Sequence, residues 1–117
     1  MRRGDVAIVS GAGDYGKPRP SVIVQSNHLT EAGLDSVIVC LVTSDVGHAP
    51  AFRITVEPSP ENGLKVVSQI MVDKLVAVRA ARVGEGVGRL DDETLFQLNR
   101  TLAFVVGLAP CAFVDVF

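Results

Sequence analysis

The feature that most constrains the fold of this chain is a succession of short, valine-rich apolar segments separated by turn-forming residues. Valine and isoleucine favour pleated sheet, and the Gly, Pro, Asn and Asp residues between the segments favour turns. The polar stretch Asn27–Asp35 predicts a connector or a short helical turn, and Met71–Lys74 is expected to separate the last two strands. We therefore expect five or six short strands, over the ranges Asp5–Ser10, Ser21–Gln25, Ser36–Thr43, Phe52–Glu57, Lys65–Ile70 and Leu75–Arg79.

One amphipathic helix follows the strands. Asp91 or Asp92 can cap its start, where carboxylates face the positive end of the helix, and Gly107 and Pro110 end it. Its apolar stripe, expected to be core or dimer surface, consists of Leu95, Leu98, Leu102, Val105 and Val106. Short strands followed by one helix predict a mostly β fold, a small closed or half-open barrel covered by a C-terminal α-helix.

Length and composition predict one compact domain. A chain of 117 residues seldom divides into two cores, so we expect a single domain over residues 1–117. Apolar residues make up 48% of the sequence and charged residues 21%, a balance that argues against disorder. The net charge of −2 argues against a protein that coats nucleic acid by bulk attraction, so any basic surface must be local.

The cysteines and the chain ends favour a cytoplasmic protein. Cys40 and Cys111 are far apart among apolar neighbours, which predicts buried free thiols in a reducing compartment. The segment Met1–Asp5 has no apolar run of the secretory type. The apolar stretch Leu102–Phe117 is interrupted and falls short of the ~20 residues that span a bilayer, so no membrane role is expected.

Motifs for metals and cofactors are missing. His28 and His48 have no cysteine or carboxylate at ligand spacing, so no metal site is predicted. The glycines of residues 11–16 match a dinucleotide-binding pattern, but Pro18 and Pro20 exclude the helix that must follow it. We therefore expect no cofactor.

Several short blocks occur in a fixed order along the chain. They are Arg3-Gly4-Asp5-Val6, a glycine-rich loop, Arg19-Pro20-x-Val-Ile-Val-Gln25, Thr43-Ser44 and Ser68-Gln69-Ile70. Over about residues 3–109, this order resembles the MazF/PemK family of toxin endoribonucleases. The resemblance implies an SH3-like small barrel of the MazF/PemK/CcdB type that acts as a homodimer.

The resemblance also implies an activity and partners. Family members cut single-stranded RNA at short sequences without a metal, by attack of the 2′-hydroxyl, leaving a 2′,3′-cyclic phosphate and a 5′-hydroxyl. The implied partner is a cognate antitoxin, whose acidic, disordered tail would occupy the RNA groove.

Two residues are the candidate catalytic groups. Arg19 matches the family arginine, and its planar guanidinium can hold two phosphate oxygens at once. Thr43 matches the family threonine, and its hydroxyl can donate to a phosphate oxygen or orient the nucleophile. The alternative interpretations are a surface cation for Arg19 and an ordinary strand residue for Thr43.

Four further residues are candidates for substrate binding. Asp14 and Lys17 are the nearest equivalents of a glutamate that the family carries in this loop, so the identity of the general base is left open. Ser44 could assist Thr43, and Gln69 matches a glutamine near the family's substrate groove. These residues could instead be flexible loop charges or solvated turn residues.

Two other functions are weighed against RNA cleavage. The first is a non-catalytic gyrase poison that resembles CcdB on the same dimeric fold; those proteins end in Trp-Gly-Ile, whereas this chain ends in Val114-Asp-Val-Phe117. The second is an SH3-like interaction module, which the absence of tryptophan disfavours. The segment Ala112–Phe117 alternates like an edge strand and could lengthen a dimer surface.

Overall fold

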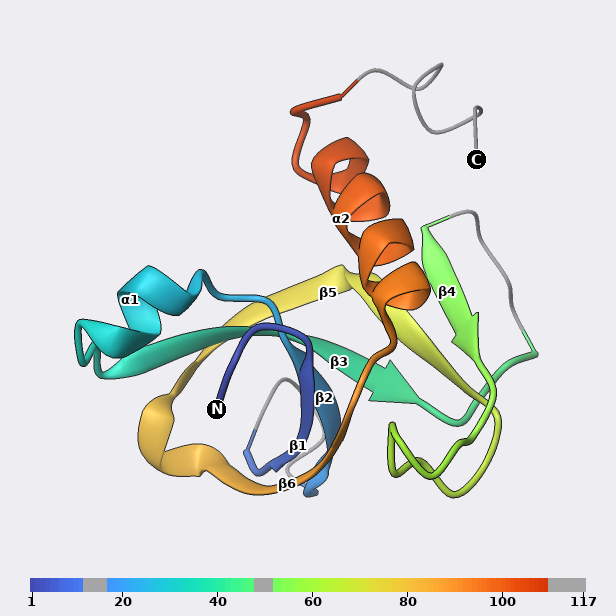
Figure 1. Cartoon of the computed structure of the whole chain (residues 1–117), viewed down its shortest axis with the longest axis horizontal. Coiled ribbons are helices and arrows are strands. Elements are labelled where there is room, and N and C mark those ends of the chain that lie inside the picture. Colours follow the sequence, from blue (N-terminus) through green and yellow to red (C-terminus); the bar gives the residue numbers. More distant parts are fainter. Residues whose placement is uncertain (12–16, 48–51, 110–117) are drawn as a thin grey trace.

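The computed structural model describes residues 1–11, 17–47 and 52–109. Asp14, His48, Cys111 and the expected edge strand Ala112–Phe117 lie outside the described residues. The elements are β1 (Asp5–Val9), β2 (Arg19–Ile23), α1 (Asn27–Glu31), β3 (Ser36–Thr43), β4 (Arg53–Val56), β5 (Ser68–Arg79), the 3-10 turn η2 (Ala80–Arg82), β6 (Val83–Arg89) and α2 (Asp92–Val105). Figure 1 shows the strands curving around one another, with α2 lying across one face of the sheet.

The described strands form one antiparallel sheet with the order β4-β5-β3-β2-β1-β6. β5 is the longest strand, at 12 residues, and it pairs with both β3 and β4. α1 is the short helical turn expected after β2, and the Ser26 side chain caps it by accepting from the backbone N–H of His28. The prediction of a mostly β fold with a C-terminal helix is confirmed.

The two strands expected over Lys65–Ile70 and Leu75–Arg79 are wrong as separate elements. The chain runs from Ser68 to Arg79 as one strand, and residues 65–67 precede it. Met71–Lys74 is not a break but a bulge: Leu41 of β3 pairs with Met71, whereas its neighbour Cys40 pairs with Leu75. A bulge interrupts the local ladder without ending the strand, and this is why the sequence pattern appears broken.

The sequence analysis missed β6 because glycine alternates along it and lowers its strand propensity. Gly88 is required by close packing, since a Cβ there would collide with the backbone of Glu61 and Asn62. Gly63 has a φ of +70°, and a Cβ on it would collide with the carbonyl of Val87. These glycines let the loop before β5 lie directly against β6.

Helix α2 begins and ends as the sequence predicts. The Asp91 side chain accepts a hydrogen bond of 2.7 Å from the backbone N–H of Thr94. The Thr94 side chain first, and this backbone bond second, lower the pKa of Asp91. Gly107, with a φ of +83°, follows the last turn. Val106 is 47% exposed, so it is not part of the core, unlike Leu98, which is fully buried.

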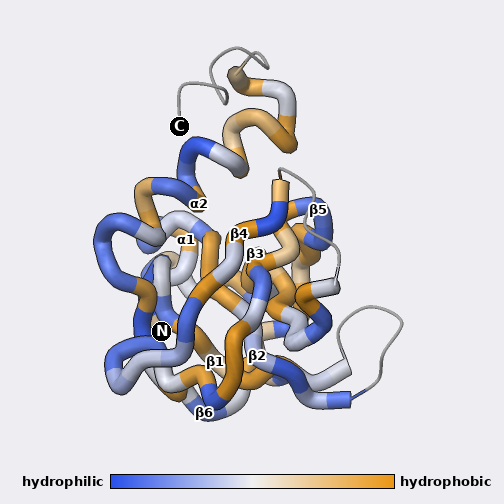
Figure 2. Tube along the Cα trace, turned by 90° about the vertical axis from the view of Figure 1, so that its right-hand side faces the viewer, coloured by the Kyte–Doolittle hydropathy of each residue, from blue (hydrophilic) through white to orange (hydrophobic). Residues whose placement is uncertain are grey.

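Two apolar clusters hold the sheet together, and Figure 2 shows hydrophobic segments concentrated along the strands. The first, here called the α2-side core, contains Val42, Ile54, Ile70 and Val72 and is covered by Leu98 and its neighbours on α2. The second contains Val9, Ile23, Val39, Leu41 and Met71. No helix among the described residues is long and apolar enough to cross a membrane.

Candidate active site

Arg19 and Thr43 lie opposite each other on adjacent strands. The antiparallel register of β2 and β3 pairs Ser21 with Leu41, and continuing it by two residues places Arg19 opposite Thr43. Directly opposed residues of an antiparallel pair project from the same face of the sheet. The strand register therefore brings together two residues that are separated by more than twenty positions in the sequence.

The same face continues across β5 and β4. Thr43 pairs with Gln69 of β5, and Gln69 pairs with Thr55 of β4. Arg19, Thr43, Gln69 and Thr55 thus form a line across four strands, here called the polar row. Because side chains alternate along a strand, this row lies on the sheet face opposite the α2-side core.

A cavity of about 520 Å³ lies at this end of β2 and β3. Its lining combines hydroxyl and cationic residues with apolar walls: Ile8, Arg19, Pro20, Val42, Thr43, Ser44, Gly63, Leu64, Lys65, Val66, Ser68 and Val87. We call it the Arg19 pocket. Arg19, Thr43 and Ser44 share it, so the residues expected to act on one phosphate do meet at one cavity.

The turn after β3 orients the Thr43 hydroxyl. The backbone N–H of Asp45 donates to Thr43 Oγ1 at 3.1 Å, and the N–H of Gly47 donates to Asp45 Oδ1 at 3.2 Å. The Thr43 oxygen is therefore used as an acceptor within the protein. Its own O–H is left to donate toward a ligand.

Arg19 is the first residue of β2 and is half-buried. Pro20 pairs with Ile8 of β1. It lies just before Ser21, the first residue of β2 that pairs with β3. A proline fits there because it has no N–H to give to a second neighbouring strand. The local sequence thus places Arg19 where the loop enters the sheet.

Two buried polar atoms lie beside these residues. Gln69 is 1% exposed, and its Oε1 makes no hydrogen bond in the described part of the chain; the same holds for Oγ of the fully buried Ser21. A buried polar atom left unsatisfied costs roughly 1–3 kcal/mol, so native structures rarely keep one without a reason. The end of the sheet that carries the polar row therefore contributes less to the stability of the fold than the α2-side core does.

The remaining predicted residues are only partly brought to this site. Ser44 is exposed and lines the Arg19 pocket. Lys17 is exposed, precedes β2 and is not among the pocket residues, and Asp14 lies outside the described residues. The geometry of the described chain therefore leaves the general base open.

Sequence reasoning missed two polar residues of the pocket, Lys65 and Ser68. Lys65 is exposed and adds a second cation, whereas the Ser68 hydroxyl donates to the carbonyl of Val66 at 2.9 Å. The signal was present in the Asn62-Gly63 turn, which Asn62 fixes by accepting from the N–H of Leu64 at 2.9 Å. Assigning Lys65 to a strand concealed that it belongs to a loop facing the pocket.

Other arginines have structural partners. Arg3 donates to Asn99 Oδ1 at 2.6 Å and to the carbonyl of Val24 at 2.9 Å, which ties the N-terminal segment to α2 and the sheet. Arg89 pairs with Asp5 at 2.8 Å between the edge strand β6 and β1. Within residues 1–11, 17–47 and 52–109, no three His, Cys, Asp or Glu side chains gather as metal ligands would.

The arrangement suits chemistry on a phosphodiester. A planar cation, a hydroxyl donor and a lysine around one cavity can bind phosphate oxygens and stabilise charge that develops on them. The apolar walls leave room for the groups attached to the phosphate.

Comparison with known proteins identifies the family. Residues 2–106 match the family of PemK-like, MazF-like toxins of type II toxin-antitoxin systems. A protein of Mycolicibacterium smegmatis named "Probable endoribonuclease MazF" is 38% identical over 110 residues, which cover 93% of this chain and 99% of that protein. The fold is therefore that of a toxin of a type II toxin-antitoxin system. The chain belongs to the PemK/MazF family, and it is an endoribonuclease of the MazF type.

Solved structures share this fold. A mycobacterial endoribonuclease in complex with its cognate antitoxin has a TM-score of 0.77 at 21% identity, covering 94% of this chain and 98% of that chain. The MazE-MazF structure (Form-II) from Deinococcus radiodurans has a TM-score of 0.73 at 17% identity, covering 93% and 97%. The predicted fold class and the resemblance drawn from the sequence blocks are both confirmed.

Proposed function

We propose that this toxin cleaves single-stranded RNA at short sequences without a metal, by attack of a 2′-hydroxyl on the adjacent phosphorus. The P–O5′ bond breaks, leaving a 2′,3′-cyclic phosphate on one fragment and a 5′-hydroxyl on the other. The observation that carries this proposal is the meeting of Arg19 and Thr43 at one cavity, from opposed positions of β2 and β3.

The proposed roles follow from the chemistry of each group. Arg19 holds the non-bridging oxygens and stabilises the negative charge of the crowded phosphorane. Thr43 donates its free O–H to a phosphate oxygen, because its own oxygen already accepts from Asp45. Ser44 contacts the adjoining substrate groups from the Arg19 pocket, and Gln69, which is buried beside Thr43 and is not among the pocket residues, contacts them from the polar row.

Proton transfer completes the reaction. One group must accept the proton of the 2′-hydroxyl, and one must deliver a proton to the leaving 5′-oxygen. Asp14 and Lys17 precede Arg19 in the chain and are the substrate-binding residues that we propose for this side of the site. Variants of these two residues, compared by pH–rate profile, identify the proton acceptor.

We also propose that the toxin acts as a homodimer, controlled by an antitoxin with an acidic, disordered tail. A dimer supplies a longer groove than a chain of this size can form alone. The proposal is supported by an apolar groove of about 400 Å³ along α2 that includes Val106 and Leu108, which are 47% and 82% exposed. The antitoxin follows from the family and from the complexes solved for its structural relatives. We expect the protein in the cytoplasm, where its RNA substrate is found.

The test is to incubate purified protein with a long RNA in EDTA and to map the cut ends by sequencing. We expect cuts at one short sequence, with cyclic phosphate and 5′-hydroxyl ends, and cleavage by Arg19→Ala that is slower by on the order of 100- to 1,000-fold. Intact RNA at high enzyme concentration contradicts the proposal. The gyrase-poison alternative predicts inhibited supercoiling instead, and the family comparisons do not favour it.

A further inference from the structure

We propose that Arg53 is a second RNA-binding residue, which holds a phosphate away from the scissile one, and that Asp73 is its positioning residue. This inference rests on the proposed RNA cleavage and extends the substrate track from Arg19 along the polar row to the edge strand β4.

The strand register places Arg53 on the face that carries the polar row. Arg53 of β4 pairs with Met71 of β5, and Thr55 of β4 pairs with Gln69 of β5. Met71 lies two residues after Gln69 along β5. Residues two apart share a face, so Arg53 projects on the same side as Thr55 and Gln69. Neighbouring strands lie about 4.8 Å apart, so three steps across the sheet separate β4 from β2 by roughly 14 Å. Side chains that stand straight out of the sheet at these two strands would therefore contact different phosphates.

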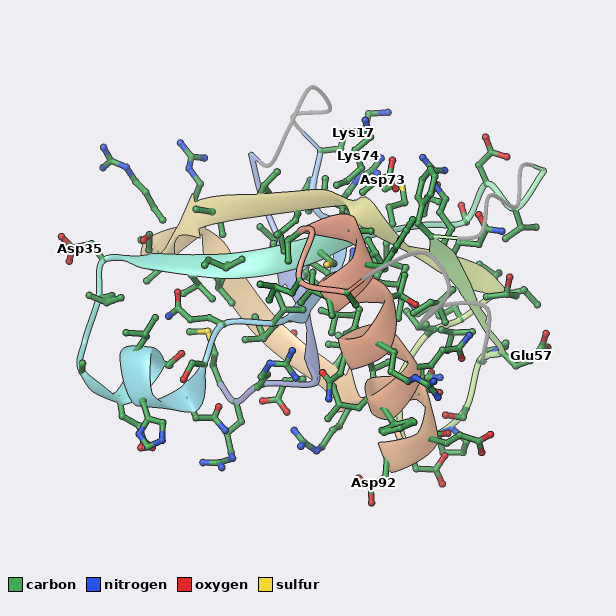
Figure 3. All side chains as sticks on the ribbon, turned by 90° about the horizontal axis from the view of Figure 1, so that it is seen from above. Lys17, Asp35, Glu57, Asp73, Lys74 and Asp92 are labelled. Atoms are coloured by element: carbon green, nitrogen blue, oxygen red, sulfur yellow. The ribbon has the colours of Figure 1, made fainter. Side chains whose placement is uncertain are left out.

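The β5 bulge supplies the residue that holds Arg53. The ladder with β3 jumps from Met71 to Leu75, so three residues are left without partners on β3. Val72 remains fully buried in the α2-side core, whereas Asp73 and Lys74 are exposed. Figure 3 shows Asp73 and Lys74 of β5, and Lys17 of the loop before β2, on the side of the molecule away from Asp92, which marks the start of α2. Bulges occur next to active sites because they redirect side chains.

The Arg53–Asp73 contact leaves part of the guanidinium available. Arg53 Nε lies 3.3 Å from Asp73 Oδ1, and Nη2 lies 3.4 Å from Oδ2. A guanidinium has five N–H donors, so this side-on contact uses two and leaves three, including both on Nη1. The Arg53 side chain is only 19% exposed, and its direction is therefore restricted.

The carboxylate also shapes what Arg53 can do. Asp73 offsets much of the charge of Arg53, so the pair adds little long-range attraction for RNA. A fixed, planar fork instead selects a phosphate in one position, which is the property for which arginine differs from lysine. We therefore expect Arg53 to affect the register of RNA on the site more than the bulk affinity.

The experiment compares two RNAs that share one cleavage site: one trimmed close to the scissile linkage, the other extended by several nucleotides on each side. Arg53→Ala should raise KM for the extended RNA by at least about tenfold, leave kcat nearly unchanged, and have little effect on the trimmed RNA. Arg53→Lys should restore less than half of the loss, because it keeps the charge and loses the fork. Asp73→Asn should raise KM for the extended RNA by a smaller factor than Arg53→Ala.

Arg79→Ala is the matched control, because Arg79 is an exposed arginine at the other end of β5, opposite Ser36. It removes the same charge and should leave both RNAs unaffected. Equal kinetics of Arg53→Ala and wild type on the extended RNA overturn the inference, and so does an equal loss on both RNAs. If the wild type cuts no RNA, the proposed function has failed. Anisotropy with an extended RNA carrying 2′-deoxyribose at the scissile position then still decides whether Arg53 contributes to binding.

Discussion

The two faces of the sheet where β4, β5 and β3 meet are built in opposite ways. Val42, Ile70 and Ile54 point into the α2-side core, whereas their neighbours Thr43, Gln69 and Thr55 form the polar row on the other face. At these positions one face buries apolar side chains under Leu98, and the other buries Gln69 beside Leu41 and Met71, with its Oε1 making no hydrogen bond within the described residues. The difference teaches that alternate residues of the same strands serve stability and function largely separately; Val42 does both, because it also lines the Arg19 pocket, whereas the effects of Leu98 and of the polar row should be separable by mutation.

The largest effect should come from Arg19→Ala. Removing a donor that stabilises transition-state charge costs on the order of 100- to 1,000-fold in kcat. Because Arg19 is half-buried at a strand end, the free energy of unfolding should change by less than about 1 kcal/mol. Single-turnover cleavage and urea denaturation measure the two quantities. The cleavage rate of Arg19→Lys should fall between the rates of the wild type and of Arg19→Ala. A fully active Arg19→Ala would contradict a role of the polar row in the mechanism.

The matching change on the other face is Leu98→Ala. Leu98 is fully buried in the α2-side core, so truncating it should lower the free energy of unfolding by about 3 kcal/mol. Cleavage per folded molecule should stay at the wild-type value, because no polar-row residue is changed. Urea denaturation and activity at low temperature test this. A loss of cleavage in fully folded protein would show that the two faces are coupled.

A smaller effect, of opposite sign for stability and activity, is expected for Gln69→Met. The substitution conserves volume and removes a buried oxygen that has no hydrogen-bond partner among the described residues, so the free energy of unfolding should rise by about 1 kcal/mol. RNA cleavage should fall, because the amide is one of the proposed substrate contacts. A thermal melt measures the change in stability, and a cleavage assay on the same sample measures the change in activity. A destabilised variant would mean that the amide supports the fold.

The smallest effect at neutral pH concerns Cys40, which burial keeps protonated. Desolvation raises the pKa of Cys40 from 9.0 to about 12, against a lesser opposing effect of Arg3. Below pH 9 the thiol is protonated in both the folded and unfolded states, so it adds no pH dependence. Between pH 9 and about 12 only the unfolded state releases the proton, and the free energy of unfolding should fall. The difference in slope between wild type and Cys40→Val measures this, and identical slopes would contradict it.

Much of the fold could be predicted from local pattern. β1, β3, β4 and α2 lie within a residue or two of their predicted ranges because each carries a clear period and clear turn or capping residues. β6 could not be predicted, since its glycines reflect the close approach of Asn62 and Glu61, a contact between distant segments. The bulge in β5 likewise depends on the register with β3, and the sequence of β5 alone does not show that register.

The site divides in the same manner. Arg19, Thr43, Ser44 and Gln69 could be named from short blocks in sequence order, and the structure brings the first three to one pocket and places Gln69 beside Thr43. Lys65 escaped prediction because it lies in a loop rather than the expected strand, and Arg53 because its surroundings come from β5 and its bulge.

The sequence by itself determined which segments become strands, where α2 begins and ends, and which residue types are available for phosphate chemistry, because these depend on neighbours within a few positions. Tertiary structure decided which of those residues meet. Pairing β2 with β3 and β5 with β4 requires contacts between segments far apart in the chain, and only that register places Arg19, Thr43 and Gln69 in one row. The physical reason is that a one-residue shift in any of these pairings would move every side chain of the shifted strand to the other face of the sheet.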